Sequence, residues 1–209
     1  MKKTLSTLLL LLVSTVLLAQ NAQYQKAVAK YKTVSSLTAT AVKTKHKSSV
    51  AKDAVAQGTL YVKKPNKVLI TTNGGKDALL MNGTNFTMTV SGRKFKTNST
   101  QNPQFKTFQN VLESIFTGGS IDLSKNSDVE ITKSGNNVVL TITPTVDKKN
   151  AKRQLFTSFV LTIDSKTSEL RTLRMNEKKG NYTEYKFSGY QFGATVSDSQ
   201  FKYTTLLVV

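Results

Sequence analysis

The sequence predicts a mainly β protein with two helices, and three observations lead to this fold class. Apolar and polar residues alternate in many short runs, as they do in strands that have one buried side. Turn signals such as Pro65-Asn66 and Asn82-Gly83 separate these runs. Only residues 24–36 and 103–117 carry apolar side chains at helical spacing.

Residues 1–22 have the pattern of a secretory signal peptide. Lys2 and Lys3 precede an apolar run, and Ala19 or Ala22 precedes the expected cleavage site. The run is too short for a comfortable membrane span, and no other stretch is long enough for one. The chain contains no cysteine, which excludes both disulfides and a lipid-modified cysteine after the signal. We expect a soluble, exported protein in which residues 23–209 form one domain.

Basic residues greatly outnumber acidic ones. The formal net charge is +18 and falls by two when Lys2 and Lys3 are removed. Such an excess favours association with anionic partners such as phospholipid head groups, lipopolysaccharide or nucleic acid. The lysines are dispersed rather than gathered in one run, so solubility alone explains the charge equally well.

A helix and a strand open the mature chain. In residues 24–36, four apolar side chains share a face that would pack across a curved sheet. These residues are Ala27, Val28, Tyr31 and Val34. Residues 37–45 are predicted as a strand in which neither side is strongly apolar, because Lys43 follows Ala39 and Ala41 on one of them.

Residues 58–70 give the clearest hairpin, with Pro65-Asn66 as its turn. Leu60, Val62 and Lys64 fall on one side of its first strand because side chains alternate. Lys64 is therefore a cation in phase with buried residues. Either it lies at the strand end and extends into water, or the apolar side lines a cavity into which Lys64 reaches.

Residues 78–82 and 85–91 form a second hairpin around an Asn-Gly turn. Phe86 and Met88 lie on its apolar side. They are either ordinary core residues or part of a surface that accommodates variable ligands, for which methionine is suited. A short basic strand follows over residues 93–97.

Residues 103–117 are predicted as a helix that Asn102 caps, Pro103 begins and Gly118-Gly119 ends. The pattern fits a helix that covers one side of a sheet. The residues of its wide apolar side are Phe105, Phe108, Val111, Leu112, Ile115 and Phe116.

The second half of the chain is again β. Alternation predicts strands at 129–131, 138–142, 155–163, 170–175 and 182–190. The residues expected on one side of the third are Leu155, Thr157, Phe159, Leu161 and Ile163. Phe201 and Tyr203 suggest a last short strand.

The search for catalytic motifs is mostly negative. There is no cysteine nucleophile, no phosphate-binding glycine loop and no Gly-x-Ser-x-Gly motif. The single histidine, His46, cannot form a zinc site and is expected on the surface, so we expect neither a metal nor a cofactor. Asp128 and Glu130 share a strand side, which leaves a carboxylate hydrolase as a remote alternative. Aromatic and basic residues interleave at 93–96 and 182–190, but an exported protein rarely meets nucleic acid, so we expect none.

Two stretches of the chain resemble a known family. The first is Gly58-Thr59-Leu60-Tyr61-Val62-Lys63-Lys64-Pro65-Asn66, followed by Leu80-Met81-Asn82-Gly83. The second runs from Phe159 to Asp164, from Leu170 to Met175 and from Gly180 to Phe187. Both resemble the periplasmic lipoprotein carriers (LolA-like), and the resemblance spans most of the mature chain. Lys64 stands where that family has an arginine, and an ammonium lacks the planar donor fork of a guanidinium.

The resemblance implies a strongly curved antiparallel sheet of about ten strands, a half-open barrel with helices covering its concave side. It implies a monomeric, non-enzymatic periplasmic carrier of lipoprotein acyl chains, with an inner-membrane release complex and an outer-membrane acceptor as partners. The helix at 103–117 would be the lid, and Lys64 would tie the strand face to it. The cavity residues would be Leu60, Val62, Lys64, Val68, Ile70, Phe86, Met88, Leu140, Phe159 and Leu161.

Two alternatives stay open beside the carrier. One is an envelope protein that binds another amphiphile, such as a glycolipid. The other is a basic protein that binds polyanions on its surface and has no cavity. A transient association with anionic membranes is compatible with all of these readings.

Overall fold

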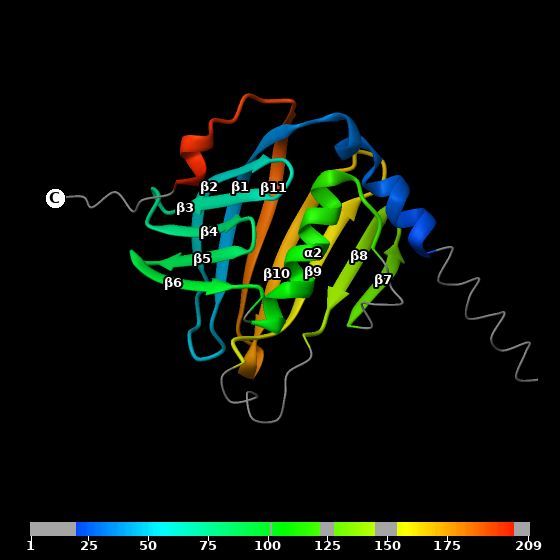
Figure 1. The fold of residues 1–209 in the computed structure, drawn as a ribbon. Helices are drawn as coiled ribbons and strands as arrows, with labels where there is room; N and C mark the ends of the chain where they lie inside the picture. The colour runs from blue at the N-terminus through cyan, green and yellow to red at the C-terminus, as the bar shows by residue number, and fades with distance from the viewer. Residues whose placement is uncertain (1–19, 101, 122–127, 145–153, 203–209) are drawn as a thin grey trace, which may run out of the picture.

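The fold is a single antiparallel sheet wrapped around one helix (Figure 1). A computed structural model describes residues 20–100, 102–121, 128–144 and 154–202. The strands of the first half are β1 (Ser36–His46), β2 (Ala54–Lys63), β3 (Lys67–Thr72), β4 (Asp77–Asn82), β5 (Asn85–Val90) and β6 (Arg93–Asn98). Those of the second half are β7 (Val129–Ser134), β8 (Asn137–Ile142), β9 (Phe156–Asp164), β10 (Leu170–Glu177) and β11 (Tyr182–Phe192).

The strand order shows that the sheet is open. The eleven strands lie in the order β6-β5-β4-β3-β2-β1-β11-β10-β9-β8-β7, so β6 and β7 are the two edges. All paired strands except β1 and β11 are consecutive in the sequence, so the fold consists of two runs of hairpins joined along β1 and β11. The predicted mainly β, half-open sheet is confirmed, with one strand more than the approximate count.

The N-terminal helix is shorter than predicted. The chain is α-helical over residues 20–27, continues as a 3₁₀ turn, η1 (Ala29–Thr33), and is extended at Val34. Residues 34–36 were thus wrongly included in the helix. The chain must turn here because β1 begins at Ser36, and because the side chain of Tyr31 is fully buried against the sheet.

The second helix, α2 (Pro103–Thr117), lies in the concave face of the sheet (Figure 1). Pro103 begins it, and Gly118 ends it with a left-handed backbone (φ 69°) that an L side chain would strain. All six residues of the predicted apolar side are buried. The prediction for Asn102 was wrong in one respect: its side chain makes no capping hydrogen bond, and its amide instead lies 3.5 Å from Thr97 Oγ1.

One continuous core fills the space between α2 and the sheet. It contains Tyr24, Ala27, Val28 and Tyr31 from the N-terminal segment, the apolar side of α2, and inward residues from every strand between β1 and β5 and between β7 and β11. The burial of this much apolar surface is the main stabilising contribution to a chain without disulfides.

Strand β9 departs from the predicted alternation. Leu155 is 53 % exposed, whereas its neighbour Phe156 is buried. The ladder pairs Ser158 with Asn176 and Phe156 with Glu177, so Thr157 is an extra residue without a directly opposite partner. Such a bulge reverses which side of the sheet the preceding residues occupy. The expectation that Leu155 and Thr157 share the side of Phe159 was therefore wrong.

Strand β1 also differs from the prediction. Leu37, Ala39, Ala41 and Lys43 form a buried side, whereas neither side was expected to be strongly apolar. The small alanine side chains leave room for the core, and Lys43 is buried because it has an acidic partner, described below.

The structure explains why the hairpin motif begins with a glycine, Gly58. A Cβ added at Gly58 would lie 1.7 Å from the carbonyl oxygen of Thr71 on the paired strand β3. No side chain fits at this position while β2 and β3 remain paired.

The chain ends differently from the prediction around Phe201. Residues Asp198–Phe201 form a 3₁₀ turn, η4, rather than a strand, and Tyr203 lies outside the described residues. Phe201 packs with Leu69 and Ala78 in a small cluster separate from the main core. Asp198 holds this segment to the sheet, because it pairs with Lys67 at 2.8 Å and with Lys63 at 3.1 Å.

Candidate ligand-binding site

The structure brings most of the predicted cavity residues together beneath α2. Met88 is partly buried against the main core, and the residues that belong to that core are Leu60, Val62, Val68, Ile70, Phe86, Leu140, Phe159 and Leu161. The remaining residue of the set, Lys64, lies in the turn that follows β2.

The phenylalanines of α2 pack directly on these residues. Phe108 stacks on Phe159 with ring centroids 4.2 Å apart, and Phe105 stacks on Phe86 at 4.6 Å. The helix therefore occupies the place where the concave face would receive a ligand. In this arrangement the predicted residues form a packed core around α2.

An open pocket of about 720 Å³ lies next to this core. Its walls come from β1, β2, β4, β5 and β6 on one side and from β9, β10 and β11 on the other. Of the ten predicted cavity residues, only Met88 lines it. Its apolar lining is Ala54, Val55, Ala56, Met88, Val90, Phe95, Phe156 and Met175. Its volume falls within the range of about 300–1,000 Å³ that is typical of ligand pockets.

The pocket adjoins the first turn of α2. Phe156, which lines the pocket, meets the ring of Phe105 with centroids 6.0 Å apart and an edge-to-face geometry. Phe105 and Phe156 both belong to the core beneath the helix, so their rings stand between the pocket and the rest of that core. A movement of this end of α2 would open the core to the pocket.

A buried ion pair lies in the pocket wall. Lys43 Nζ is 2.9 Å from Asp77 Oδ2, and the two side chains are 10 % and 11 % exposed. Asp77 Oδ1 also accepts the backbone N–H of Ser91 at 2.7 Å. Burial acts to raise the pKa of Asp77, but the hydrogen bonds from Lys43 and Ser91 outweigh it and hold the pKa below its usual value. Burial likewise raises the pKa of Tyr185, which also lines the pocket.

Two further lysines follow Lys43 along the chain: Lys45 on the same side of β1, and Lys47 directly after the end of that strand. Lys45 forms an ion pair with Glu177, and the exposed Lys47 has no acidic partner among the described residues. One wall of a largely apolar pocket thus carries three cations in a row.

Sequence reasoning missed the residues of this pocket wall. The signal was present, because Lys43 stands in phase with Ala39 and Ala41 on β1. The same argument singled out Lys64 in phase with Leu60 and Val62. Asp77 gave no comparable signal, since its partner is 34 positions away in the sequence.

Lys64 contacts a backbone carbonyl near α2. Its Nζ donates to the carbonyl oxygen of Lys32, at 3.3 Å, and burial lowers the pKa of Lys64. The accepting carbonyl belongs to η1 and not to α2. The two are adjacent, however, because a Cβ on Gly118 would lie 2.9 Å from the backbone nitrogen of Lys32.

The C-terminal end of α2 is fastened by the N-terminal segment. Tyr24 Oη and Ser114 Oγ are hydrogen-bonded at 2.8 Å, and Gln25 Nε2 donates to the carbonyl of Gly119 at 2.6 Å. The rings of Tyr31 and Phe116 meet edge to face at 5.5 Å. Nearer the middle, Gln109 donates to the carbonyl of Gly83. The start of α2 is held mainly by the stacking of Phe105.

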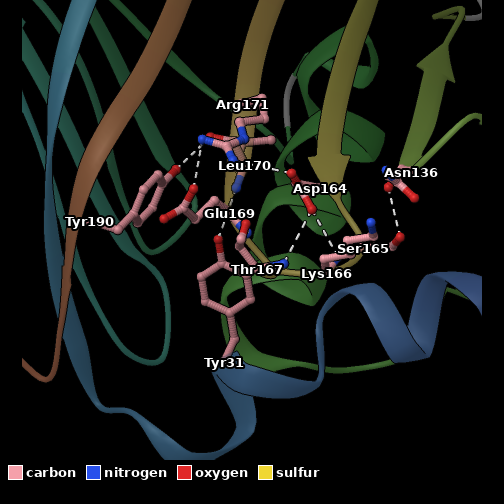
Figure 2. A network of polar contacts seen from close by, with 10 residues as sticks. All are labelled: Tyr31, Asn136, Asp164, Ser165, Lys166, Thr167, Glu169, Leu170, Arg171 and Tyr190. Carbon is pink, nitrogen blue, oxygen red and sulfur yellow. Dashed lines mark hydrogen bonds and ion pairs between the residues drawn. The ribbon is translucent and has the colours of Figure 1, made fainter.

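Figure 2 shows how the N-terminal segment is in turn attached to the sheet. Tyr31 Oη accepts the N–H of Leu170 at 3.2 Å, and Tyr190 Oη donates to the carbonyl of the same residue at 2.6 Å. The neighbouring Arg171 pairs with Glu169 at 2.7 Å and with Asp164 at 3.1 Å. Burial raises the pKa of both tyrosines, so both remain neutral hydrogen-bonding groups. This network fixes the end of the molecule opposite the pocket.

The remaining candidates for chemistry do not line the pocket. His46 is partly exposed, pairs with Asp53 at 2.7 Å and stacks on Tyr182. Glu130 is exposed on the edge strand β7, and neither it nor Asp128 lines the pocket. In the described residues no three histidine, cysteine or acidic side chains gather as a metal site would require. No helix in that part of the chain is long and apolar enough to cross a membrane.

Solved structures with similar chain paths are distant in sequence. A DUF1329 family protein from Desulfovibrio piger is 14 % identical with a TM-score of 0.45, and the match covers 86 % of this chain and 95 % of that one. A putative outer membrane lipoprotein-sorting protein domain from Vibrio parahaemolyticus is 14 % identical with a TM-score of 0.45, and the match covers 86 % of this chain and 94 % of that one. The lipoprotein LppX from Mycobacterium tuberculosis is 13 % identical with a TM-score of 0.41, and the match covers 86 % of this chain and 97 % of that one.

No curated protein sequence matches the chain. A family model does: the one described as "Outer membrane lipoprotein carrier protein LolA" matches residues 32–204. That range contains all eleven strands, α2 and the pocket. The chain therefore belongs to the family of outer membrane lipoprotein carrier proteins.

Proposed function

We propose that this protein carries the acyl chains of lipoproteins through the periplasm and delivers them toward the outer membrane, without catalysing a reaction. The proposal rests on the apolar side of α2. In a chain that matches the carrier family, this side fills the concave face of the sheet, and an open, mainly apolar pocket lies beside it. The chain would reach the periplasm through the signal peptide expected at residues 1–22 and act there as a monomer.

In the proposed mechanism acyl chains enter at the pocket and displace the start of α2. The chains would first meet Met88, Phe156 and Met175, then the ring of Phe105. With the helix displaced, the predicted cavity residues, among them Leu60, Phe86 and Leu140, would contact the chains instead of α2.

Release follows from competition between the helix and the ligand. Each buried CH₂ contributes ~0.8 kcal/mol, so a few acyl chains alone would bind too tightly for a carrier. The apolar side of α2 regains its own core contacts when the ligand leaves, which lowers the net affinity. The Lys64 contact to Lys32 would be broken and remade in the same cycle. An inner-membrane release complex and an outer-membrane acceptor would supply and receive the cargo.

A matched pair of variants tests the pocket as the entry. Ala56 is half-buried in the pocket wall, while Gln57 on the same strand is exposed on the other side of the sheet. We expect Ala56→Trp to weaken the binding of a fluorescent fatty acid and its displacement by a diacyl lipopeptide. Gln57→Trp adds the same indole outside the pocket and should leave both unchanged. Equal probe binding by both variants would contradict the assignment of the pocket.

The delivery step needs its own measurement. Native mass spectrometry of protein isolated from the periplasm should show co-purified lipoprotein or lipid, and a labelled lipoprotein should pass from the loaded protein to acceptor membranes. A preparation that binds acyl probes but never transfers a lipoprotein would argue against delivery while leaving amphiphile binding in place.

One observation favours a second candidate, an envelope protein for another, anionic amphiphile. Lys43, Lys45 and Lys47 line the pocket in a row, and Lys47 has no described acidic partner. The acyl anchor of a lipoprotein offers no phosphate to such a row, whereas a phospholipid does. Competition by a phosphatidylglycerol and by a neutral diacylglycerol of equal chain length separates the two candidates.

A further inference from the structure

Most of the large apolar side chains that are exposed in the described residues lie at one opening. In the described residues, five large apolar side chains are exposed by two-fifths or more: Val50, Val55, Val90, Phe95 and Leu155. Three of them, Val55, Val90 and Phe95, line the pocket. Val50 lies in the connection between β1 and β2, and Leu155 directly precedes the pocket residue Phe156.

Cations surround the same opening. Lys47 lines the pocket, Arg93 and Lys94 pair in the ladder with the pocket residues Val90 and Thr89, and Lys96 follows Phe95. Lys76 is close, because its carbonyl accepts the N–H of Gly92 in the β5–β6 turn. None of these five side chains forms an ion pair within the described part of the chain.

The described carboxylates at this end do not offset these cations. Asp77 pairs with Lys43 and Glu177 with Lys45, and Asp53 is hydrogen-bonded to His46 at 2.7 Å. The five cations Lys47, Lys76, Arg93, Lys94 and Lys96 outnumber Asp53, so the field beside the exposed apolar groups is positive.

We propose that the mouth surface, defined as Lys47, Val55, Val90, Arg93, Lys94 and Phe95, docks on the face of an anionic bilayer. Lysine and arginine attract lipid phosphates, and single apolar side chains between them enter the interface. A protein partner fits this surface less well, because the cores of protein interfaces are depleted in lysine. Protection of the edge strand β6 from pairing would explain its lysines but not the exposure of Phe95 and Val90.

Docking in this orientation turns the pocket toward the lipid. This consequence rests on the proposed function, since acyl chains would then pass between bilayer and pocket with little exposure to water. The docking itself does not rest on it, and vesicle binding can be measured without any cargo.

The test is co-sedimentation with phosphatidylcholine vesicles that either contain or lack phosphatidylglycerol. The protein should bind only the anionic vesicles, and more weakly at about 0.15 M salt than at low salt. Lys94→Glu should lower the affinity by at least about fivefold, the effect expected for one basic residue near such a surface. The matched control is Lys133→Glu, an exposed lysine on the opposite edge strand β7, which should change the affinity far less.

The apolar contribution is tested separately. Phe95→Ser should weaken vesicle binding, and Phe95→Leu should restore most of it, because leucine keeps an apolar group for the interface. Equal losses in Lys94→Glu and Lys133→Glu would overturn the proposal in favour of diffuse charge attraction. A protein that binds fatty acid but no vesicles would refute docking without affecting the proposed carrier function. A protein that binds anionic vesicles but no fatty acid would refute the carrier function without affecting docking. A change of sedimentation coefficient in Phe95→Ser without vesicles would assign the surface to self-association and count against the bilayer.

Discussion

Asp77→Asn removes the negative partner of Lys43 while nearly preserving the shape of the side chain. The amide oxygen of the asparagine can still accept the N–H of Ser91, which Asp77 accepts at 2.7 Å. The substitution therefore isolates the charge of the buried pair from its packing. It also leaves the ammonium of Lys43 without a partner in the wall of the pocket.

The expected loss of stability is about 3 kcal/mol. At the observed 2.9 Å, two unit charges attract by about 6 kcal/mol at an effective dielectric constant of about 20. The cost of removing both charges from water offsets much of this, but removal of one partner leaves the other buried, which typically costs about 3–5 kcal/mol. We take the lower end because the pocket admits water to Lys43.

Urea denaturation of four proteins measures the effect: the wild type, Asp77→Asn, Lys43→Met and the double variant Lys43→Met/Asp77→Asn. The double variant should recover most of the stability, because no unpaired charge remains. It should also bind an acyl probe more tightly, since the pocket wall loses both charges. A loss below about 1 kcal/mol for Asp77→Asn, or a double variant as unstable as the sum of the single ones, would refute the coupling of the pair.

Four further predictions concern other parts of the molecule. Because the pKa of Asp77 is lowered in the folded protein, its stabilisation should be complete above pH ~4, the unfolded value, and disappear as the pH falls through the lower folded value; urea midpoints should show a flatter acid limb in Asp77→Asn. Phe108→Ala should cost about 3–5 kcal/mol in thermal unfolding, since its fully buried ring stacks on Phe159; a loss below about 1 kcal/mol would mean that α2 is not packed as described. Lys64→Leu should load a labelled lipoprotein but transfer it slowly, whereas Lys64→Arg should transfer it normally, and normal transfer by both would remove Lys64 from the mechanism. Gly58→Ala should yield no folded protein by circular dichroism, because its Cβ would overlap Thr71 O; Thr59→Ala on the same strand is the control.

The strands were predictable from the sequence because alternation and turn chemistry act locally. The Asn82-Gly83 turn and the hairpin at residues 58–70 appear where the pattern placed them. The helix at 103–117 was predicted to the residue, since Pro103 and Gly118 act within one turn of its ends.

The failures arise where distant contacts decide the outcome. The bulge at Thr157 arises from the pairing of β9 with β10. The sequence of β9 alone does not predict that the preceding residue, Leu155, faces outward. Phe201 is a residue type that favours strands, but here it belongs to a 3₁₀ turn and packs against Leu69. The Lys43–Asp77 pair required knowledge of the sheet order, which brings β1 and β4 to one end of the concave face.

The sequence predicted the apolar residues beneath α2 but not the open pocket beside them, which only Met88 of that set lines. Alternation puts residues such as Leu140 and Phe159 on one side of their strands, and the structure places them in the core with α2. Whether such residues enclose a cavity or a packed core depends on how the helix sits, and that is a property of the assembled fold. The open pocket lies beside this core, and Met88 borders both.

The two unpaired edges bear on the range of cargo that the proposed carrier would accept. A closed barrel has a circumference fixed by its strand number and shear, and its bore cannot widen unless hydrogen bonds break. Strands β6 and β7 do not meet, so the arc that they end can flatten or tighten through small changes of twist between neighbouring strands. No ladder hydrogen bond is lost in such a change. The distance between the two edges is therefore adjustable, so a protein of this shape could enclose hydrophobic ligands of different widths.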